Sequence, residues 1–393
     1  MKKSFIIFMS FAVGVMAANI YYAQPILSLL ASSLGIRPDA AGLVMTLTQV
    51  GYGLGVFFVV PLGDLIENKK LILTMIGITI VAEILLGASQ SLIPYFMATI
   101  LVGLGASAVQ VIVPYTTHLY DKSQRGHIIG SLMSGLMVGI MLSRPLASLL
   151  TDFISLHAVF YFSAIMMSLV FWRLYIILPE RKPEPSNLKY RELIWSMKEM
   201  LVKTPTLQRR ALYQACMFGA FCFFWTTAPM MLVNSAFQFT QKGVAIFALA
   251  GLAGAIAAPY AGKLADRGWS KQATFIAFFI GILSFAANHF IIPGETLSLI
   301  VLIISANLLD AGVSAHLVLG QRAIFMIDPK NQSRLNGLYL VIVNMGGAFG
   351  SALGGWAYLH GGWGFSSLLG IVFPLVAMLL FLTEKLVGFK EQH

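Results

Sequence analysis

The chain has 393 residues, of which 58% are hydrophobic and only 11% are charged. Soluble domains carry about 25% charged residues, so this chain lacks the polar surface that water requires, and lipid is the expected solvent on most of its faces. The formal charge of +10 does not indicate nucleic-acid binding, because the basic residues lie at the ends of apolar stretches rather than in one patch.

Apolar stretches long enough to cross a membrane follow one another along the whole chain. A helix rises 1.5 Å per residue, so about 20 apolar residues span about 30 Å of hydrocarbon. The pattern predicts an all-α integral membrane protein with twelve transmembrane helices, at 4–31, 40–62, 71–89, 94–118, 127–150, 157–178, 209–233, 243–262, 272–292, 296–320, 335–357 and 364–386.

The distribution of Lys and Arg predicts how these helices are oriented, since cytoplasmic loops carry an excess of both. Most of the 26 basic residues lie at the termini, in alternate loops and in the segment 179–210, whereas the other loops hold only Arg37 and Lys242. The sequence therefore predicts a multi-pass protein of the cytoplasmic (inner) membrane, with both termini and the segment 179–210 in the cytoplasm.

One long polar interruption, residues 179–208, separates the sixth predicted helix from the seventh. Within it Tyr190, Ile194, Met197 and Leu201 fall on one face of a helix, which predicts an amphipathic helix on the inner membrane surface. A plain tether between two halves explains the segment equally well.

The two sides of this linker repeat short motifs in the same order. The run GASA at 105–108 recurs as GVSA at 312–315, and the loop after the second helix is similar to the loop after the eighth. Two repeated six-helix halves are typical of transporters whose site lies at the repeat interface. We therefore predict one half at 1–178 and another at 209–393.

The loop GKLADRG at 262–268 resembles the signature between helices 8 and 9 of the major facilitator superfamily. Its counterpart PLGDLIENKK at 61–70 is a variant, and the runs NIYYAQP at 19–25 and QVGYG at 49–53 are similar to the drug and sugar efflux permeases of that superfamily. The resemblance covers essentially the whole chain. It implies the major facilitator fold, with two pseudo-symmetric six-helix halves, and transport by alternating access.

Two motifs of the proton-coupled efflux members are altered in this chain. Those members carry an Arg in helix 4 four residues before a Gly, and here Thr99 precedes Gly103. Their Gly-Pro in helix 5 is also missing, since Ile140 follows Gly139 and the proline comes at Pro145. Proton antiport is therefore not implied by motif alone.

Ionisable side chains inside a bilayer cost roughly 2.5–3.5 kcal/mol each and mark functional sites. Glu83 and Asp310 lie near the middle of their predicted helices, and Arg144 lies inside helix 5. A carboxyl group in this setting can take up and release a proton, as coupling requires, whereas Arg144 stays charged and needs an acidic partner, an anionic substrate or water. Arg173 and Arg322 are close enough to helix ends to reach the cytoplasmic interface.

Structural roles are also compatible with these charges. Glu83 and Arg144 can form a buried ion pair, and Asp310 can bond the backbone of a neighbouring helix. Other candidates have a polar group on an apolar body, which suits contact with a solute, although interfacial anchoring or packing explains them too. They are Tyr21, Tyr22, Gln24, Gln49, Gln110, Trp225, Asn307 and His316.

Two loop acids, Asp64 and Asp266, are expected at the cytoplasmic face. The resemblance implies that such an acid docks against the positive end of a helix in the other half and favours the state closed on the inside. Lys69, Arg267 and Lys271 are the local partners that the sequence offers to this gate.

Glycines recur at helical spacing at 51–55, 135–139 and 346–354. Small residues let helix backbones approach closely in lipid, so these series predict helix–helix contacts and say nothing of a substrate. Cys216 and Cys222 lie within one apolar run at a spacing that fits neither a disulfide framework nor a zinc site.

The sequence contains no nucleotide-binding loop, metal-ligand cluster or nucleophile–base arrangement, so we expect no enzyme, no metal and no cofactor besides a proton gradient. The favoured function is a secondary transporter for a small organic solute, with proton-coupled efflux through Glu83 and Asp310. Two alternatives stay open: an uptake carrier or facilitator for an organic anion bound by Arg144, and a membrane sensor or scaffold that does not transport. The expected partners are the solute and lipids, with the chain acting as a monomer.

Overall fold

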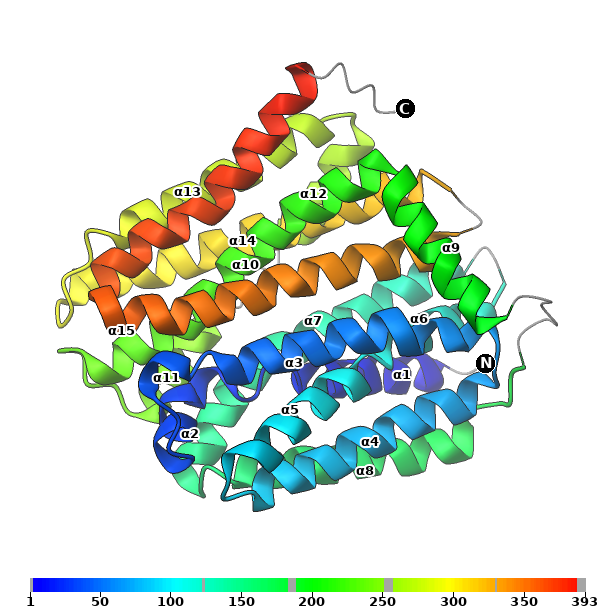
Figure 1. The fold of residues 1–393 in the computed structure, drawn as a ribbon, viewed down its shortest axis with the longest axis horizontal. Coiled ribbons are helices and arrows are strands. Elements are labelled where there is room, and N and C mark those ends of the chain that lie inside the picture. The colour runs from blue at the N-terminus through cyan, green and yellow to red at the C-terminus, as the bar shows by residue number, and fades with distance from the viewer. Residues whose placement is uncertain (1–2, 122–123, 183–188, 251–256, 329–330, 387–393) are drawn as a thin grey trace. The chain divides into compact units, whose positions relative to one another are not determined.

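The computed structural model describes residues 3–121, 124–182, 189–250, 257–328 and 331–386, and every regular element within these ranges is helical (Figure 1). Nine helices in these ranges are long and apolar enough to cross a membrane, judged by length and composition. One of them, Arg334–Glu384, contains a break at Gly362, where φ is 64°, and so covers two predicted spans. The chain is an all-helical, multi-pass membrane protein.

The described residues form two compact units, Met1–Ile36 with Leu47–Ser196, and Arg37–Thr46 with Met197–His393. The predicted division at 1–178, 179–208 and 209–393 stays a prediction. The helices of the first unit are α1 (Lys3–Ala18), η1 (Gln24–Ile26), α2 (Leu27–Ser33), η3 (Gly55–Val59), η4 (Val60–Asp64), α4 (Asn68–Ala88), α5 (Leu92–Ala106), α6 (Val109–His118), α7 (Arg125–Phe153) and α8 (Ala158–Ile177), together with most of α3 (Leu43–Leu54).

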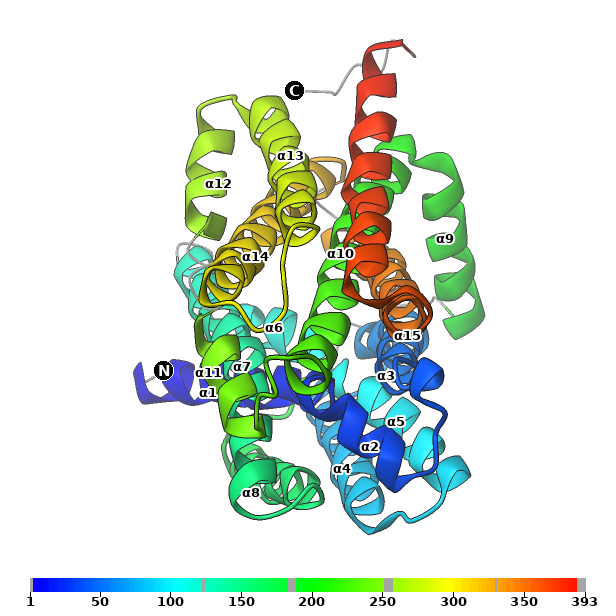
Figure 2. The same ribbon diagram turned by 90° about the vertical axis from the view of Figure 1, so that its left-hand side faces the viewer.

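The described part of the second unit is built from long and medium-length helices. They are α10 (Pro205–Asn234), α11 (Gln241–Ala250), α12 (Ala257–Asp266), α13 (Ser270–Asn288), α14 (Thr296–Phe325) and α15 (Gln332–Leu386). Figure 1 shows the first part of α15 running alongside α10, and Figure 2 shows α13 beside α14. The short η2 (Pro38–Ala40) also belongs here, because it packs against α15. Close to it in the chain, Thr46 Oγ1 donates a hydrogen bond to the Ala348 carbonyl of α15 at 2.9 Å.

Helix 1 is not the continuous helix that the range 4–31 predicts. It ends at Ala18, and the chain then passes through turns before η1 and α2. Pro25 causes part of this interruption, because proline has no N–H to continue a helix and favours the first turn of a new one. The predicted span 94–118 is likewise divided between α5 and α6 at Ser107, and the middle of span 243–262 lies outside the described residues.

The predicted glycine contacts occur in both units. In the first, α1 and α7 touch through Gly14 and Gly139, where a Cβ atom on Gly139 would collide with the Gly14 carbonyl. In the second, α10 and α15 touch in the same way through Gly219 and Gly350. Such backbone contact gains dispersion energy that larger side chains would prevent.

The linker helix α9 (Tyr190–Lys203) forms as predicted, and its buried face overlaps the predicted one at Met197. Leu193 and Met197 are the buried residues, whereas Tyr190 is partly exposed and donates a hydrogen bond to the Phe58 carbonyl at 2.7 Å. Trp195 is exposed. Attachment of α9 to the membrane surface stays a prediction.

Candidate functional site

Arg144 is fixed inside the first unit by the segment that interrupts helix 1. Its Nε donates a hydrogen bond to Gln24 Oε1 at 2.8 Å, and its guanidinium carbon lies 5.6 Å from the centre of the Tyr21 ring. The side chain is only 3% exposed. Pro145 follows it in α7 and cannot bond the carbonyl of Met141, so the helix backbone offers an extra acceptor one turn earlier.

Glu83 lies on α4 in a second polar cluster of the same unit, with 1% of its surface exposed. It hydrogen-bonds with Ser163 of α8, and the Ser163 hydroxyl donates to Asn19 Oδ1. Glu83 and Ser163 thus link α4 to α8 through a buried polar contact.

The second carboxylate oxygen of Glu83, Oε2, is buried without a hydrogen-bond partner among the described residues. Tyr22 and Tyr95 lie within electrostatic range of the Glu83 carboxyl group. The contacts described for Glu83 do not include Arg144, and the buried Glu83–Arg144 ion pair considered from the sequence stays a prediction.

The glutamines of helices 2 and 4 are also buried or bonded within the first unit. Gln110 Nε2 donates to the Tyr52 hydroxyl at 2.9 Å, and Gln49 is fully buried on α3. Tyr52 was not among the predicted residues, although it lies three residues after Gln49 on the same helix. Residues three apart share one face of a helix, so the position of Gln49 is the sequence signal that points to Tyr52.

In the second unit the structure brings together two predicted residues, Trp225 of α10 and Asp310 of α14. Trp225 Nε1 donates to Asp310 Oδ1 at 2.9 Å, and Asp310 is 5% exposed. This partner is a side chain, and a bond from Asp310 to the backbone of a neighbouring helix stays a prediction. Asn307, one turn before Asp310, donates to the Ile303 carbonyl of its own helix at 2.9 Å.

His316 is completely buried one and a half turns further along α14. Its Nδ1 lies 2.6 Å from Gln214 Oε1, and Gln214 Nε2 faces the Val313 carbonyl at 3.4 Å, which fixes the amide orientation. Since the amide oxygen accepts, Nδ1 carries the ring proton. The ring also packs 4.9 Å from the Phe278 ring, so this histidine has the contacts of a packing residue.

Arg210 is a buried charge that the sequence did not reveal. It was counted with the basic linker, yet it is 3% exposed on α10 and acts electrostatically on His316 and Tyr339. The sequence signal for the burial of Arg210 was its position in the first turns of a long apolar helix.

The loop acid Asp266 forms an ion pair with Arg322, the residue expected near the end of helix 10. The local partners predicted for the gate are therefore incomplete, because the described partner lies 56 residues along the chain. Lys69 instead places its Nζ 5.4 Å from the centre of the Tyr175 ring.

The remaining gate residues lie at helix ends. Asp64 ends η4, Arg267 follows α12, and Lys271 is the second residue of α13. Four residues after Asp64, Asn68 Oδ1 accepts a hydrogen bond from Arg181 at 2.8 Å. This bond joins the region around Asp64 to the segment after helix 6. Over the described residues no three His, Cys, Asp or Glu side chains come close enough to hold a metal ion.

Comparison with known proteins gives matches to one transporter family over most of the chain. The profile of the Major Facilitator Superfamily matches residues 9–320. The chain is 34% identical to "Putative uncharacterized transporter YgaY" of Escherichia coli (strain K12), over 97% of this chain and 95% of that protein. It is 26% identical over 173 residues to "Multidrug resistance protein D" of the same strain, which covers 44% of this chain and 43% of that one.

The fold is also found among solved structures. The crystal structure of the nucleoside transporter NupG superimposes with a TM-score of 0.74, covering 98% of this chain and 100% of that one at 14% sequence identity. A similarity at this level of identity concerns the fold alone.

Proposed function

Because the chain belongs to the major facilitator superfamily and is a membrane transporter, not an enzyme, we propose that it exports a small organic solute across the cytoplasmic membrane in exchange for protons. The observation that carries this proposal is Glu83. A carboxyl group 1% exposed in a transmembrane helix, bonded to Ser163 and with a second oxygen lacking a described partner, is stable as the neutral acid. When the site opens to water, the same group can ionise.

Asp310 is the second carrier in this proposal. Its described donor, the Trp225 indole, bears no charge, so the contact can persist whether Asp310 is ionised or neutral. A proton can therefore enter and leave without breaking the link between α10 and α14. One such carboxyl in each unit matches a repeat architecture in which both halves contribute to coupling.

The direction of transport rests on similarity. The runs NIYYAQP and QVGYG resemble efflux permeases, and the partial match to a multidrug resistance protein supports the same direction. The aromatic and amide groups around Arg144 and Asp310 suit a solute with an apolar body and a polar end. A monomer in the inner membrane with both termini in the cytoplasm completes the proposal.

Everted membrane vesicles provide the test. Respiration acidifies their interior, and a solute that enters in exchange for protons relieves the quenching of a pH-sensitive dye. A panel of organic cations, neutral drugs, sugars and organic anions is added in turn. We expect at least one solute to give a signal with the wild type, no signal with Glu83→Gln, and an unchanged signal with Glu295→Gln, an exposed carboxylate before α14.

A solute moved equally well by the wild type and by Glu83→Gln would reject coupling through Glu83. Exchange of a solute with no proton movement at all would reject antiport as a class.

Uptake or facilitated passage of an organic anion is the second candidate, favoured by Arg144. Its charge is permanent, and Gln24 and Tyr21 hold the guanidinium in one orientation. Counterflow of a labelled anion that an imposed pH gradient does not accelerate separates this function from antiport. It should be lost in Arg144→Gln and largely kept in Glu83→Gln.

A further inference from the structure

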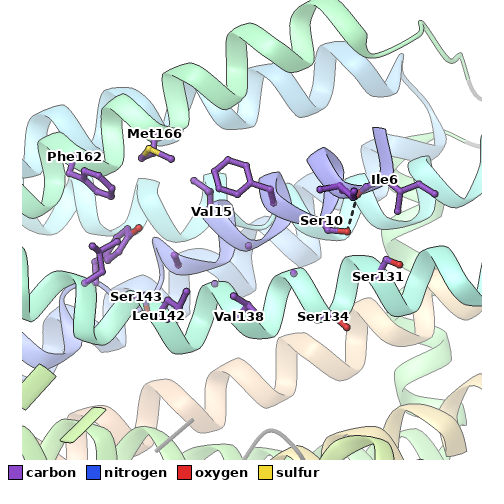
Figure 3. Close-up of a pocket in the computed structure, with 18 residues that line it drawn as sticks. Ile6, Ser10, Val15, Ser131, Ser134, Val138, Leu142, Ser143, Phe162 and Met166 are labelled. Atoms are coloured by element: carbon purple, nitrogen blue, oxygen red, sulfur yellow. Dashed lines mark hydrogen bonds between the residues drawn. The ribbon is translucent and has the colours of Figure 1, made fainter. Parts of the chain in front are cut away.

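A cavity of about 680 Å³ opens on the first unit between α1, α7 and α8 (Figure 3), and Tyr22 is among its lining residues. Gly14 and Ala18 of α1 form buried parts of its wall. Ile7 on α1 and Val138 on α7 form its rim and are 69% and 54% exposed. It is therefore a groove with a deep floor and an open edge.

The depth of the groove follows from the glycine contact between α1 and α7. Gly14 and Gly139 bring the two backbones together, and both line the groove. Phe162 and Met166 of α8 close the third side, as Figure 3 shows. The same small residues that allow close packing thus leave a channel beside it.

The lining of the groove is suited to hydrocarbon. None of its lining residues is charged. The hydroxyls of Ser10, Ser134 and Ser143 donate to carbonyls of their own helices, at 2.9, 2.9 and 2.7 Å respectively. A polar or charged ligand would lose its water here and gain few hydrogen bonds in return.

The groove is long and runs along the candidate membrane span Ile128–Phe153. It is lined along α7 from Ser131 to Leu146, which corresponds to about 22 Å at 1.5 Å per residue. One leaflet of the hydrocarbon core is about 15 Å thick, so the groove is long enough to hold an acyl chain along the depth of a leaflet. Acyl chains are the molecules that surround a rim at this depth, and an empty apolar groove would forfeit the dispersion contacts of its lining.

We propose that this groove is a binding site for one acyl chain of a membrane phospholipid, lying along α7 with its terminal part between Phe162 and Leu142. This inference does not depend on the solute or on proton coupling. Because the acyl chain leaves bulk lipid and not water, only its better packing in the groove favours binding. A slowly exchanging lipid is therefore expected, not a permanently bound one.

Photolabelling of the full-length chain in liposomes tests the proposal. The probe is phosphatidylethanolamine with a diazirine on one acyl chain, and labelled residues are mapped by mass spectrometry. We expect labels to concentrate on the groove-lining residues of α1, α7 and α8. Val138→Trp, which fills the groove from its rim, should reduce that labelling at least threefold.

Val81→Trp is the matched control, because Val81 is 56% exposed on α4 and lies outside the groove. It should leave the labelling unchanged, and Leu142→Trp should repeat the effect of Val138→Trp if that variant folds poorly. Labels spread evenly over the exposed apolar residues, or equal labelling in Val138→Trp and wild type, would overturn the proposal. So would cross-links between two chains through Val138→Cys, because a second copy would then occupy the groove.

Discussion

The indole nitrogen of Trp225 and the carboxylate of Asp310 lie 2.9 Å apart and join α10 to α14 inside the second unit. Both residues are buried, at positions where water is scarce. A carboxyl group is tolerated in such a place when it is hydrogen-bonded or neutral. This pair therefore holds a titratable group in a fixed position within an apolar helix bundle.

Removing either partner should have different consequences for folding and for coupling. Trp225→Phe deletes the donor, and we expect a loss of about 1–3 kcal/mol in the free energy of unfolding, with transport reduced several-fold. Asp310→Asn keeps an acceptor for the indole, so it should fold normally and yet lose transport driven by a pH gradient. Thermal unfolding in detergent and proteoliposome transport measure the two effects.

Trp269→Phe provides the control for the first variant, because Trp269 is exposed in the loop after α12. It should match the wild type in both measurements. Undiminished pH-driven transport by Asp310→Asn would contradict a coupling role for Asp310.

The glycine contact between α1 and α7 makes a prediction for stability. Gly139→Leu must push its Cβ into the Gly14 backbone, whereas Gly130→Leu on the same helix meets nothing within 4 Å. We expect Gly139→Leu to lower the melting temperature in detergent by at least several degrees, since overpacking costs roughly 1–3 kcal/mol or more. Gly130→Leu should leave it unchanged or raise it, because leucine is a better helix former than glycine. Similar melting temperatures for the two variants would contradict the described contact.

Most of the predicted spans and the all-helical fold could be read from the sequence because length and apolarity alone define a membrane-crossing helix. The interruptions could not, since Asn19, Tyr21 and Ser107 lie in stretches that stay apolar on average. A turn depends on local hydrogen bonds to the backbone, such as the 2.6 Å bond from the Ser107 side-chain Oγ to the Leu104 carbonyl. Hydropathy does not reveal such bonds.

The same distinction applies to the candidate sites. Isolated charges such as Glu83 and Asp310 stand out against an apolar background, and they were identified. The residues around Glu83, which are Ser163 and Asn19, were missed because small polar residues occur throughout transmembrane helices. The pairing of Asp266 with Arg322 also escaped prediction, because it joins residues far apart in the chain.

This last pair should matter for transport more than for stability. Both side chains are substantially exposed, and exposed ion pairs contribute about 0–1 kcal/mol. Asp266→Asn is therefore expected to melt within a few degrees of the wild type while transporting more slowly, and Asp266→Arg with Arg322→Asp should recover part of the rate. Glu199→Gln, which breaks the exposed pair with Lys203, serves as the control. A large fall in melting temperature for Asp266→Asn, with transport intact, would argue for a purely structural pair.

The predicted orientation is open to direct labelling. Single cysteines at Lys69 and Lys271 should react with a membrane-impermeant maleimide only from the cytoplasmic side, and cysteines at Arg37 and Lys242 only from outside. Cys216 and Cys222 lie within α10 and should contribute little background. Labelling of Lys69→Cys in intact cells would reverse the orientation deduced from the basic residues.

The transport mechanism is tested most directly by separating exchange from proton coupling in Glu83→Gln, using a solute identified in the vesicle screen. Purified protein in liposomes is assayed for solute counterflow without a pH gradient and for accumulation driven by one. Proton coupling through Glu83 predicts that Glu83→Gln keeps counterflow and loses gradient-driven accumulation, with Glu295→Gln unchanged in both. Accumulation by Glu83→Gln at the wild-type rate would contradict it.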